Sequence, residues 1–290
     1  MDPQNEDLIA ITPAMREGSG LVKFSKEFPE RFYDVAIAEQ HSVTLAAGMA
    51  CEEKKPVVAI YSTFLQRAYD QLIHDVALQN LDVLFAIDRA GLVGEDGPTH
   101  SGNYDLAYLR CIPNMIIAVP ADENEARILL TTTFNHNGPA AVRYPRGGGI
   151  NAVINLELNS VEIGKGRVIN SMDSDLLVLN FGTLIATSEE VAKELNASLL
   201  DMRFVKPLDK ELIAEYSKGK KAIITIEDGA MTGGAGSAVS EWAQENKISA
   251  QIIICGIPDE FIDHSSREEM IEAVGLDKDG ILAKVRDFLS

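Results

Sequence analysis

The chain is organised around the stretch Asp34-Val-Ala-Ile-Ala-Glu-Gln-His-Ser-Val-Thr-Leu-Ala-Ala-Gly-Met-Ala50. Residues 31–36, which overlap its start, have the apolar character of a buried strand, and the closely spaced apolar residues from Gln40 onward predict a packed helix. Glu39 is therefore expected where a strand gives way to a helix N-terminus. The helix dipole favours a carboxylate there, so a purely structural role is one interpretation. A ligand site is the other, because α/β folds bind ligands at the ends of their strands.

Length and composition indicate a soluble protein with about two domains. The chain has 290 residues, of which 46% are hydrophobic and 24% are charged, which is typical of a soluble globular protein. It contains no apolar run of the roughly 18 to 20 residues that a membrane span needs, and its acidic start lacks the features of a signal or transit segment. We therefore expect a cytoplasmic protein. Three widely spaced cysteines are expected to be reduced core thiols: Cys51, Cys111 and Cys255.

The net charge excludes some classes of partner. A formal charge of -18 argues against binding to nucleic acid or to anionic membranes, because such proteins need a basic face. Four arginines close to glycines stand out against this acidic background: Arg67, Arg89, Arg143 and Arg146. They are either receptors for an anionic substrate or members of ordinary surface ion pairs.

Apolar strands alternate with helices in the first half of the chain. Strands are expected at 8–11, 31–36, 56–61, 82–87, 115–119 and 140–144. Helices are expected at 12–28, from residue 40 onward, at 62–79 and at 122–134, the last capped by Asp122. This alternation predicts a largely parallel sheet that is covered on both faces.

A second, smaller α/β domain is expected after a linker at 151–160, so that the domains span residues 1–150 and 161–290. Its strands are expected at 176–180, 197–202, 221–226 and 250–254, after a hairpin over 161–170. Its helices are expected at 186–195, 210–216, 237–245 and 278–289. The predicted fold class is therefore α/β, with two consecutive domains whose largely parallel sheets are flanked by helices.

Residues 88–102 match no pattern of secondary structure and include four glycines. A loop of that length in a compact domain is usually functional or mobile. It contains Asp96 and His100, for which acid–base or hydrogen-bonding work on a substrate is expected. His41 and His74 are expected to be structural.

The sequence 233–237, Gly-Gly-Ala-Gly-Ser, is the second glycine-rich segment. Such a turn either cradles a phosphate or allows a strand and a helix to pack closely. Because it lacks the spacings of the known nucleotide-binding loops, close packing is favoured. The sequence also lacks Gly-Asp-Gly followed by Asn, a pattern that holds Mg²⁺ and a diphosphate.

Six segments together resemble the 1-deoxy-D-xylulose-5-phosphate synthase family of transketolase-like enzymes, which use thiamine diphosphate. These segments are residues 10–20 (AITPAMREGSG), 34–41 (DVAIAEQH), 61–71 (YSTFLQRAYDQ), 86–91 (AIDRAG), 96–100 (DGPTH) and 141–147 (AVRYPRG). The resemblance runs from about residue 8 to the C-terminus and is looser in the second half. It implies a pyrimidine-binding domain followed by a transketolase C-terminal domain. The family's N-terminal domain, which binds the cofactor diphosphate through Mg²⁺, is expected to precede this sequence, so no metal ligands are expected here.

The same resemblance implies the roles of individual residues. Glu39 matches the acid that hydrogen-bonds the aminopyrimidine of thiamine, and such an acid must share a proton near neutral pH, which burial favours. Phe64 matches the aromatic that stacks on the pyrimidine, and Tyr61 lines the same pocket. Asp96 and His100 are expected to act in catalysis and to contact substrate. A further substrate contact is implied for Arg67. Arg89 and Arg146 are implied as candidates for the acceptor phosphate, with Arg143 as the alternative to Arg146. Pro98 departs from the family pattern.

The implied reaction condenses pyruvate with D-glyceraldehyde 3-phosphate with loss of CO₂, a transferase step that feeds isoprenoid and thiamine biosynthesis. The family is typically homodimeric. Three alternatives remain open: a piece of a longer synthase, a natural subunit of a split enzyme whose partner supplies the diphosphate site, as in pyruvate dehydrogenase, or a non-catalytic binding module of the same fold. The joint presence of Glu39, Arg67, Asp96 and His100 disfavours the last.

Overall fold

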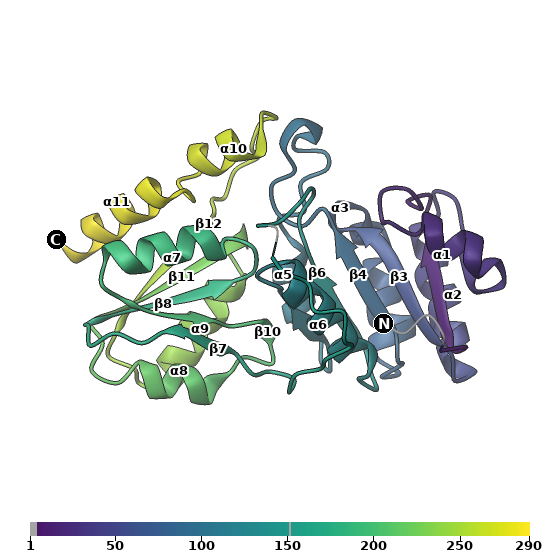
Figure 1. Cartoon of the computed structure of the whole chain (residues 1–290), viewed down its shortest axis with the longest axis horizontal. Coiled ribbons are helices and arrows are strands. Elements are labelled where there is room, and N and C mark those ends of the chain that lie inside the picture. Colours follow the sequence, from purple (N-terminus) through teal and green to yellow (C-terminus); the bar gives the residue numbers. More distant parts are fainter. Residues whose placement is uncertain (1–4, 151) are drawn as a thin grey trace.

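The structure is a computed structural model that describes residues 5–150 and 152–290. Two α/β units lie side by side in Figure 1, the first coloured purple to teal and the second green to yellow. Residues 1–4 of the predicted first domain and residue 151 of the predicted linker lie outside the described residues. The predicted fold class, two α/β domains with mostly parallel sheets, is confirmed.

The first sheet has seven strands among the described residues, in the order β10-β5-β6-β4-β3-β1-β2. Their bounds are β1 Leu8–Thr12, β2 Phe32–Asp34, β3 Lys55–Tyr61, β4 Leu84–Asp88, β5 Ile116–Ala118, β6 Ala140–Arg143 and β10 Phe204–Lys206. All neighbours pair in parallel except β10, which joins β5 antiparallel. Because β10 comes from the second half of the chain, that half completes the sheet of the first.

Both faces of this sheet are buried. Val58 and Ile60 of β3 belong to the same apolar cluster as Val43 of α2 (Glu39–Cys51). Val57 belongs to the cluster that includes Leu129 of α6 (Glu123–Phe134) on the other face. Alternate side chains of a strand point to opposite faces, so a sheet covered twice needs a continuous apolar run. The predicted cover of helices on both faces is confirmed.

Three predictions in this half need correction. The strand expected at 31–36 is the short β2 at the sheet edge, largely exposed because it has only β1 as a neighbour. The helix expected over 12–28 is reduced to α1 (Val22–Glu27), which follows the turn at Gly18 and Gly20. The stretch 62–79 is helical but irregular. It consists of α3 Ser62–Leu65, the 3₁₀ turn η2 Gln66–Ala68, α4 Tyr69–Gln71 and the π-helical η3 Leu72–Ala77.

The remaining short elements of this half are the 3₁₀ turns η1 (Pro29–Arg31) and η4 (Gly94–Asp96) and the helix α5 (Asp105–Arg110). The helix α5 was not predicted. The predicted cap of α6 is confirmed, because the Asp122 carboxylate accepts a hydrogen bond from the Glu125 amide at 2.8 Å. That bond satisfies one of the amides left unpaired at the helix start.

Within residues 152–290 a second sheet has five strands, in the order β12-β11-β8-β9-β7. Their bounds are β7 Arg167–Asn170, β8 Leu176–Phe181, β9 Ser198–Asp201, β11 Ala222–Ala230 and β12 Gln251–Ile257. The helices are α7 Ile185–Glu194, α8 Lys210–Tyr216, α9 Ala235–Glu245, α10 Arg267–Ala273 and α11 Lys278–Leu289. The four predicted helices are confirmed, whereas α10 and β10 were missed. The predicted hairpin over 161–170 is wrong, since β7 pairs antiparallel with β9 instead.

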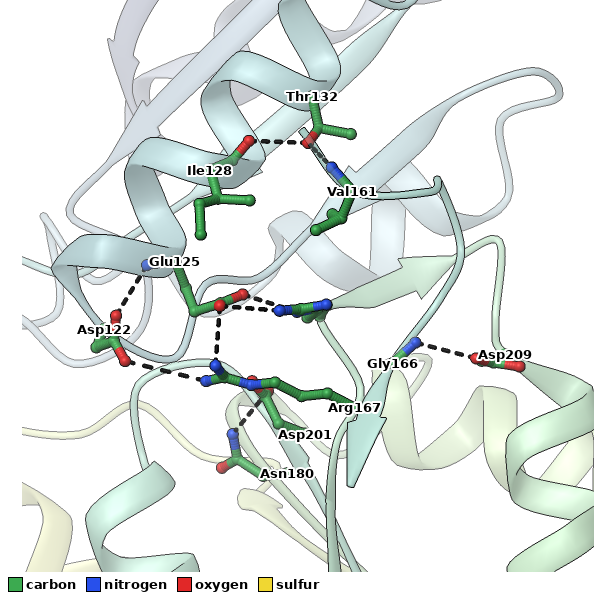
Figure 2. Close-up of polar contacts among 11 residues, drawn as sticks. Asp122, Glu125, Ile128, Thr132, Val161, Gly166, Arg167, Asn180, Asp201 and Asp209 are labelled. Atoms are coloured by element: carbon green, nitrogen blue, oxygen red, sulfur yellow. Dashed lines mark hydrogen bonds and ion pairs between the residues drawn. The ribbon is translucent and has the colours of Figure 1, made fainter. Parts of the chain in front are cut away.

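A buried ion-pair cluster joins the two halves (Figure 2). Glu125 of α6 accepts hydrogen bonds from Arg203 at 2.8 and 3.0 Å and from Arg167 at 2.9 Å. Arg167 also donates to Asp201 at 2.9 Å. Burial raises the pKa of Asp201 to about 6, although Arg167 opposes the shift. We call these four residues the Glu125 cluster.

The cysteines are only partly as predicted. All three are free thiols, but Cys51 and Cys111 are exposed, and only Cys255 lies in the core. Burial raises the pKa of the Cys255 thiol to about 11. None of the helices over the described residues is both long and apolar enough to cross a membrane.

Candidate functional site

The predicted site residues gather at the carboxyl ends of β3, β4 and β6, beside the start of α2. The turn that leads into α2 is fixed by Asp34, whose carboxylate accepts hydrogen bonds from the amides of Ala14 at 2.9 Å and Ala36 at 3.0 Å. Ala36 has a φ of 58°, an uncommon conformation for a residue with a side chain. These bonds hold it there, and the helix then begins at Glu39.

Glu39 is the most buried of the candidate acids, with 3% of its surface exposed. Its carboxylate accepts a hydrogen bond from Arg67 Nη1 at 2.6 Å. The Arg67 side chain is 53% exposed, so the pair lies where the interior meets solvent. A buried carboxylate at this depth needs a partner, and Arg67 is the partner that the structure provides.

Two aromatic side chains lie next to this pair. The rings of Tyr61 and Phe64 stack with centroids 5.6 Å apart and planes 11° from parallel. The guanidinium carbon of Arg67 lies 5.2 Å from the Phe64 centroid, and the His100 ring meets Phe64 edge-on at 5.5 Å. Residues that lie far apart in the sequence thus meet in one constellation, in which aromatic rings lie beside a buried acid. Its members are Glu39, Tyr61, Phe64, Arg67 and His100.

Arg89 lies on the other side of Tyr61. Its guanidinium carbon is 4.0 Å from the Tyr61 centroid, and its Nη1 donates to Asp88 at 2.6 Å and to the Gly18 carbonyl at 3.1 Å. Burial raises the pKa of Asp88, and Arg89 opposes that shift. Desolvation likewise raises the pKa of Tyr61. Arg89 is therefore engaged with three partners within the chain.

Gly18 and Asp88 are site residues that sequence reasoning missed. A Cβ atom at Gly18 would lie 2.0 Å from the Tyr61 hydroxyl, so only glycine fits against this ring. The signal for Asp88 was present, because it ends β4 in the same way that Tyr61 ends β3, and the carboxyl ends of parallel strands meet at one edge of the sheet.

Asp96 faces Arg146. The Arg146 Nε atom lies 3.4 Å from the Asp96 carboxylate, and its Nη1 lies 3.6 Å from Glu95 and donates to the Val93 carbonyl at 3.2 Å. The Arg146 side chain is 38% exposed. It borders a cavity of about 320 Å³. The lining residues are Val93, Gly94, Glu95, Arg146, Gly147, Ser266, Arg267 and Glu268.

Arg143 is not grouped with the other candidate arginines at a solvent-facing site. It is 5% exposed, and its Nε donates to the buried Asp105 at 2.9 Å. Its Nη2 donates to the carbonyls of Gly102 at 3.2 Å and Asp228 at 2.9 Å. Burial by itself lowers the pKa of Arg143, but Asp105, Asp228 and Glu227 together outweigh that effect and raise the pKa. Arg143 thus ties three segments together within the core.

The glycine-rich turn at 233–237 packs a helix against a strand, as predicted. A Cβ atom at Gly236 would lie 2.5 Å from both Ile254 and Thr225. The amides at this helix start bind a carboxylate of the chain itself. Glu227 accepts hydrogen bonds from the amides of Ala235 and Gly236, each at 2.7 Å. Burial raises the pKa of Glu227 to about 7, although both amide hydrogen bonds oppose the shift. Sequence reasoning missed Glu227, which, like Tyr61, lies at the carboxyl end of a parallel strand.

Over the part of the chain that the structure describes, no group of three or more His, Cys, Asp or Glu side chains is arranged to hold a metal ion. The candidate site instead combines a buried acid, stacked rings and several arginines. Such a site suits an aromatic ligand that exchanges a proton and a substrate that carries negative charge.

Comparison with known proteins gives close relatives. The chain is 60% identical over its whole length to the 1-deoxy-D-xylulose-5-phosphate synthase of Cellvibrio japonicus (strain Ueda107), of which it covers 45%. It is 56% identical to the same enzyme of Bordetella petrii, over 99% of this chain and 46% of that one. The chain therefore spans less than half the length of these relatives.

Solved structures agree on the fold. A protein described as a split gene transketolase, inactive beta4 tetramer, superposes with a TM-score of 0.86 at 28% identity and covers 98% of this chain and 92% of its own. The transketolase of Campylobacter jejuni superposes with a TM-score of 0.77 at 17% identity, over 97% of this chain and 44% of that one. The latter likeness speaks for the fold alone.

Two family profiles cover nearly the whole sequence. Residues 2–149 match the transketolase pyrimidine binding domain, and residues 164–281 match the transketolase C-terminal domain. The order of the two matches agrees with the order of the two sheets. The chain belongs to the transketolase family.

Proposed function

We propose that this chain is the pyrimidine-binding and C-terminal part of a 1-deoxy-D-xylulose-5-phosphate synthase, a thiamine-diphosphate-dependent transferase. It would condense pyruvate with D-glyceraldehyde 3-phosphate with loss of CO₂. Identity of 60% to a synthase of that name supports this assignment over the split-subunit alternative, for which the relative is 28% identical. We include in the proposal the domain boundaries: a pyrimidine-binding domain at 1–150, a linker at 151–160 and a C-terminal domain at 161–290.

One observation carries it: Glu39, the stacked Tyr61 and Phe64 rings, Arg67 and His100 form one continuous constellation. A non-catalytic module has no need of a buried carboxylate beside partly exposed aromatic rings, since burying a charge is costly. The arrangement fits the pyrimidine of thiamine diphosphate, because the rings offer stacking surfaces and Glu39 offers a group that can donate or accept a proton.

Each residue of the constellation then has a task. Phe64 and Tyr61 hold the pyrimidine ring, and Glu39 holds and moves a proton at its ring nitrogen. When bound, thiamine diphosphate supplies the nucleophilic carbon and the electron sink that the reaction needs. Asp96 and His100 orient the substrate and handle its protons. The contact of His100 with Phe64 and that of Asp96 with Arg146 support these roles.

The arginines divide between pyruvate and the phosphate of the acceptor. Arg67, next to Glu39, is proposed to receive the pyruvate carboxylate. Arg146, 38% exposed at the rim of a cavity, is proposed to receive the acceptor phosphate, with Arg89 as the second candidate. Arg143 is not proposed for this role, because its hydrogen bonds are already made inside the core.

The diphosphate and Mg²⁺ are proposed to be held by a segment outside this sequence. The relatives are more than twice as long as this chain, which leaves room for it. We further propose a cytoplasmic homodimer.

The test is a calorimetric titration with thiamine diphosphate and Mg²⁺, paired with an assay of pyruvate decarboxylation that depends on glyceraldehyde 3-phosphate. It should be run on the chain alone and on the chain joined to the N-terminal part of the Cellvibrio japonicus enzyme. We expect weak or no binding by the chain alone, and binding with turnover by the joined protein. A joined protein that binds the cofactor but condenses other substrates instead would reject the synthase assignment.

A further inference from the structure

The loop that carries Asp96 and His100 belongs to the first half of the sequence, but the second half holds it. The loop leaves β4 at Asp88 and returns at Gly102. In Figure 1 it is drawn in blue and rises toward the yellow segment that leads into α10. The side chain of Leu92 is fully buried in an apolar cluster that is otherwise composed almost entirely of residues from the second half.

Both backbone groups of Leu92 are bound by one ion pair of the second half. The Asp228 carboxylate, near the end of β11, accepts a hydrogen bond from the Leu92 amide at 3.2 Å. Arg267, the first residue of α10, donates from Nε to the Leu92 carbonyl at 3.2 Å. Arg267 also donates from Nη2 to Asp228 at 2.6 Å. Asp228, Arg267 and the Leu92 peptide therefore form a closed ring of hydrogen bonds.

The base of the loop is built around this ring. Gly91 and Gly102 exchange two backbone hydrogen bonds, each of 2.8 Å, which close the loop. Gly91 has a φ of 73°, and a Cβ atom there would lie 2.2 Å from the Asp228 carboxyl carbon. Glycine at this position therefore allows the positive φ of the turn and leaves room for the Asp228 carboxylate.

The tip of the loop also lies against the second half. A Cβ atom at Gly97 would lie 2.9 Å from the Cβ of His264, and one at Gly94 would lie 3.3 Å from the amide of Arg267. Asp96 and His100 thus occupy a segment whose path is set on one side by residues 264–267. On the other side Thr63 donates to the Thr99 carbonyl at 3.2 Å.

We propose that Asp228 and Arg267 are positioning residues for the reaction, and that they hold the loop so that Asp96 faces Arg146 and His100 faces Phe64. This inference rests on the proposed function. A loop with four glycines has a large conformational entropy when free. Hydrogen bonds to a buried ion pair offset that entropy at one peptide, and misplacement of groups around a reacting centre by as little as 1 Å is costly to rate.

The Glu125 cluster provides a control, because it joins the two halves without holding the loop. It also joins the two halves through partly buried arginines, yet its members contact α6 and the second sheet and, within the described residues, make no hydrogen bond to residues 88–102. Weakening it should loosen the interface without freeing the loop. Arg203→Gln is the matched control, because Glu125 keeps Arg167 as a partner.

The experiment compares Arg267→Gln with Arg203→Gln in the protein joined to the N-terminal part of the Cellvibrio japonicus enzyme. Hydrogen–deuterium exchange is read in peptides covering residues 88–102, together with kcat, KM and cofactor affinity. For Arg267→Gln we expect exchange in these peptides to be about 10-fold faster or more, kcat to fall by about 10-fold or more, and cofactor affinity to be unchanged. For Arg203→Gln we expect the exchange of these peptides and kcat to stay at the parent values.

Arg267→Lys guards against a variant that fails to fold, because lysine keeps the charge beside Asp228 but cannot make both bonds of the guanidinium. It should give intermediate loop exchange and partial recovery of kcat. Unchanged loop exchange in both Arg267 variants would overturn the inference, as would faster exchange with parent kcat. If the parent protein lacks synthase activity the proposed function fails, whereas the exchange comparison still decides whether Asp228 and Arg267 hold the loop.

Discussion

Arg67 Nη1 lies 2.6 Å from Oε1 of Glu39, so the acid proposed to serve the cofactor is bound by a cation of the same site. The hydrogen bond from Arg67 occupies an oxygen of the carboxylate that would exchange a proton with a bound pyrimidine. The Arg67 side chain is 53% exposed, so it also borders solvent. We infer that a bound pyrimidine displaces Arg67 from Glu39 and leaves its charge available to an anionic substrate.

Glu39→Gln should abolish most of the activity of the joined enzyme. Glutamine has the shape of glutamate and still accepts a hydrogen bond from Arg67, but it cannot exchange a proton. Loss of such an acid costs about 10²- to 10⁴-fold in kcat. The melting temperature should change little, and circular dichroism serves as the control for folding. A kcat within a few fold of the parent would rule out the role of Glu39.

Arg143 and Arg146 should behave oppositely although they are three residues apart. Arg143→Leu leaves the buried Asp105 without its cation, which typically costs about 3 to 5 kcal/mol of unfolding free energy. Arg146→Leu removes half-exposed ion pairs, so its cost in stability should stay within about 1 kcal/mol. Urea denaturation measures both.

The kinetic part of this comparison concerns the acceptor. Arg146→Leu should raise KM for glyceraldehyde 3-phosphate, with a loss in kcat/KM of about 2 to 5 kcal/mol of transition-state binding. The KM for pyruvate should stay near the parent value. Equal losses for both substrates would contradict the assignment of Arg146 to the phosphate.

Only part of the candidate site could be predicted from the sequence. Glu39, Tyr61, Phe64 and His100 could be grouped in advance through the resemblance of their segments to one family, and the shared edge of a parallel sheet explains why they meet. The burial of Arg143 could not, since it depends on partners from Asp105 to Asp228 that no local pattern connects.

The strand predictions failed for the same reason, because strands pair with partners that are distant in the sequence. Residues 161–170 looked like a hairpin, but the partner of β7 is β9, and β10 crosses to the other sheet. The bond between Leu92 and Asp228 spans 136 positions. Local periodicity finds the elements themselves and gives no information about such partners.

The stability of the fold should depend on pH through Glu227. Burial raises the pKa of this carboxyl from 4.5 to about 7, so the folded chain binds a proton that the unfolded chain releases between these values. Its contribution to stability is therefore present below about pH 4.5 and is lost as the pH rises to about 7, by an amount on the order of 3 kcal/mol.

Glu227→Gln isolates this effect, because glutamine stays neutral. The free energy of unfolding of the parent should fall relative to Glu227→Gln between pH 5 and 7 and then run parallel to it, as measured by urea denaturation at about four pH values. Glu241 gives a control of opposite sign, since its hydrogen bond with Arg110 lowers the pKa of Glu241. A constant difference between parent and Glu227→Gln would mean that Glu227 is ionised throughout.

Gly18 should be essential for the position of Tyr61. In Gly18→Ala the new methyl group would lie 2.0 Å from the Tyr61 hydroxyl, so the ring must leave its place against Phe64 and Arg89. Overpacking of this kind costs about 1 to 3 kcal/mol, and the cofactor affinity of the joined enzyme should fall with it. Tyr61→Phe alone should cost less, because it keeps the ring and its stacking.

The double variant Gly18→Ala/Tyr61→Phe distinguishes a local clash from a general loss of structure. Removing the hydroxyl removes the closest contact of the methyl group, so part of the stability and cofactor affinity lost in Gly18→Ala should return. The two effects would then be non-additive, as expected for residues in contact. Additive losses would mean that Gly18 acts through its backbone, for example through the carbonyl that accepts from Arg89 at 3.1 Å, rather than by leaving room for Tyr61.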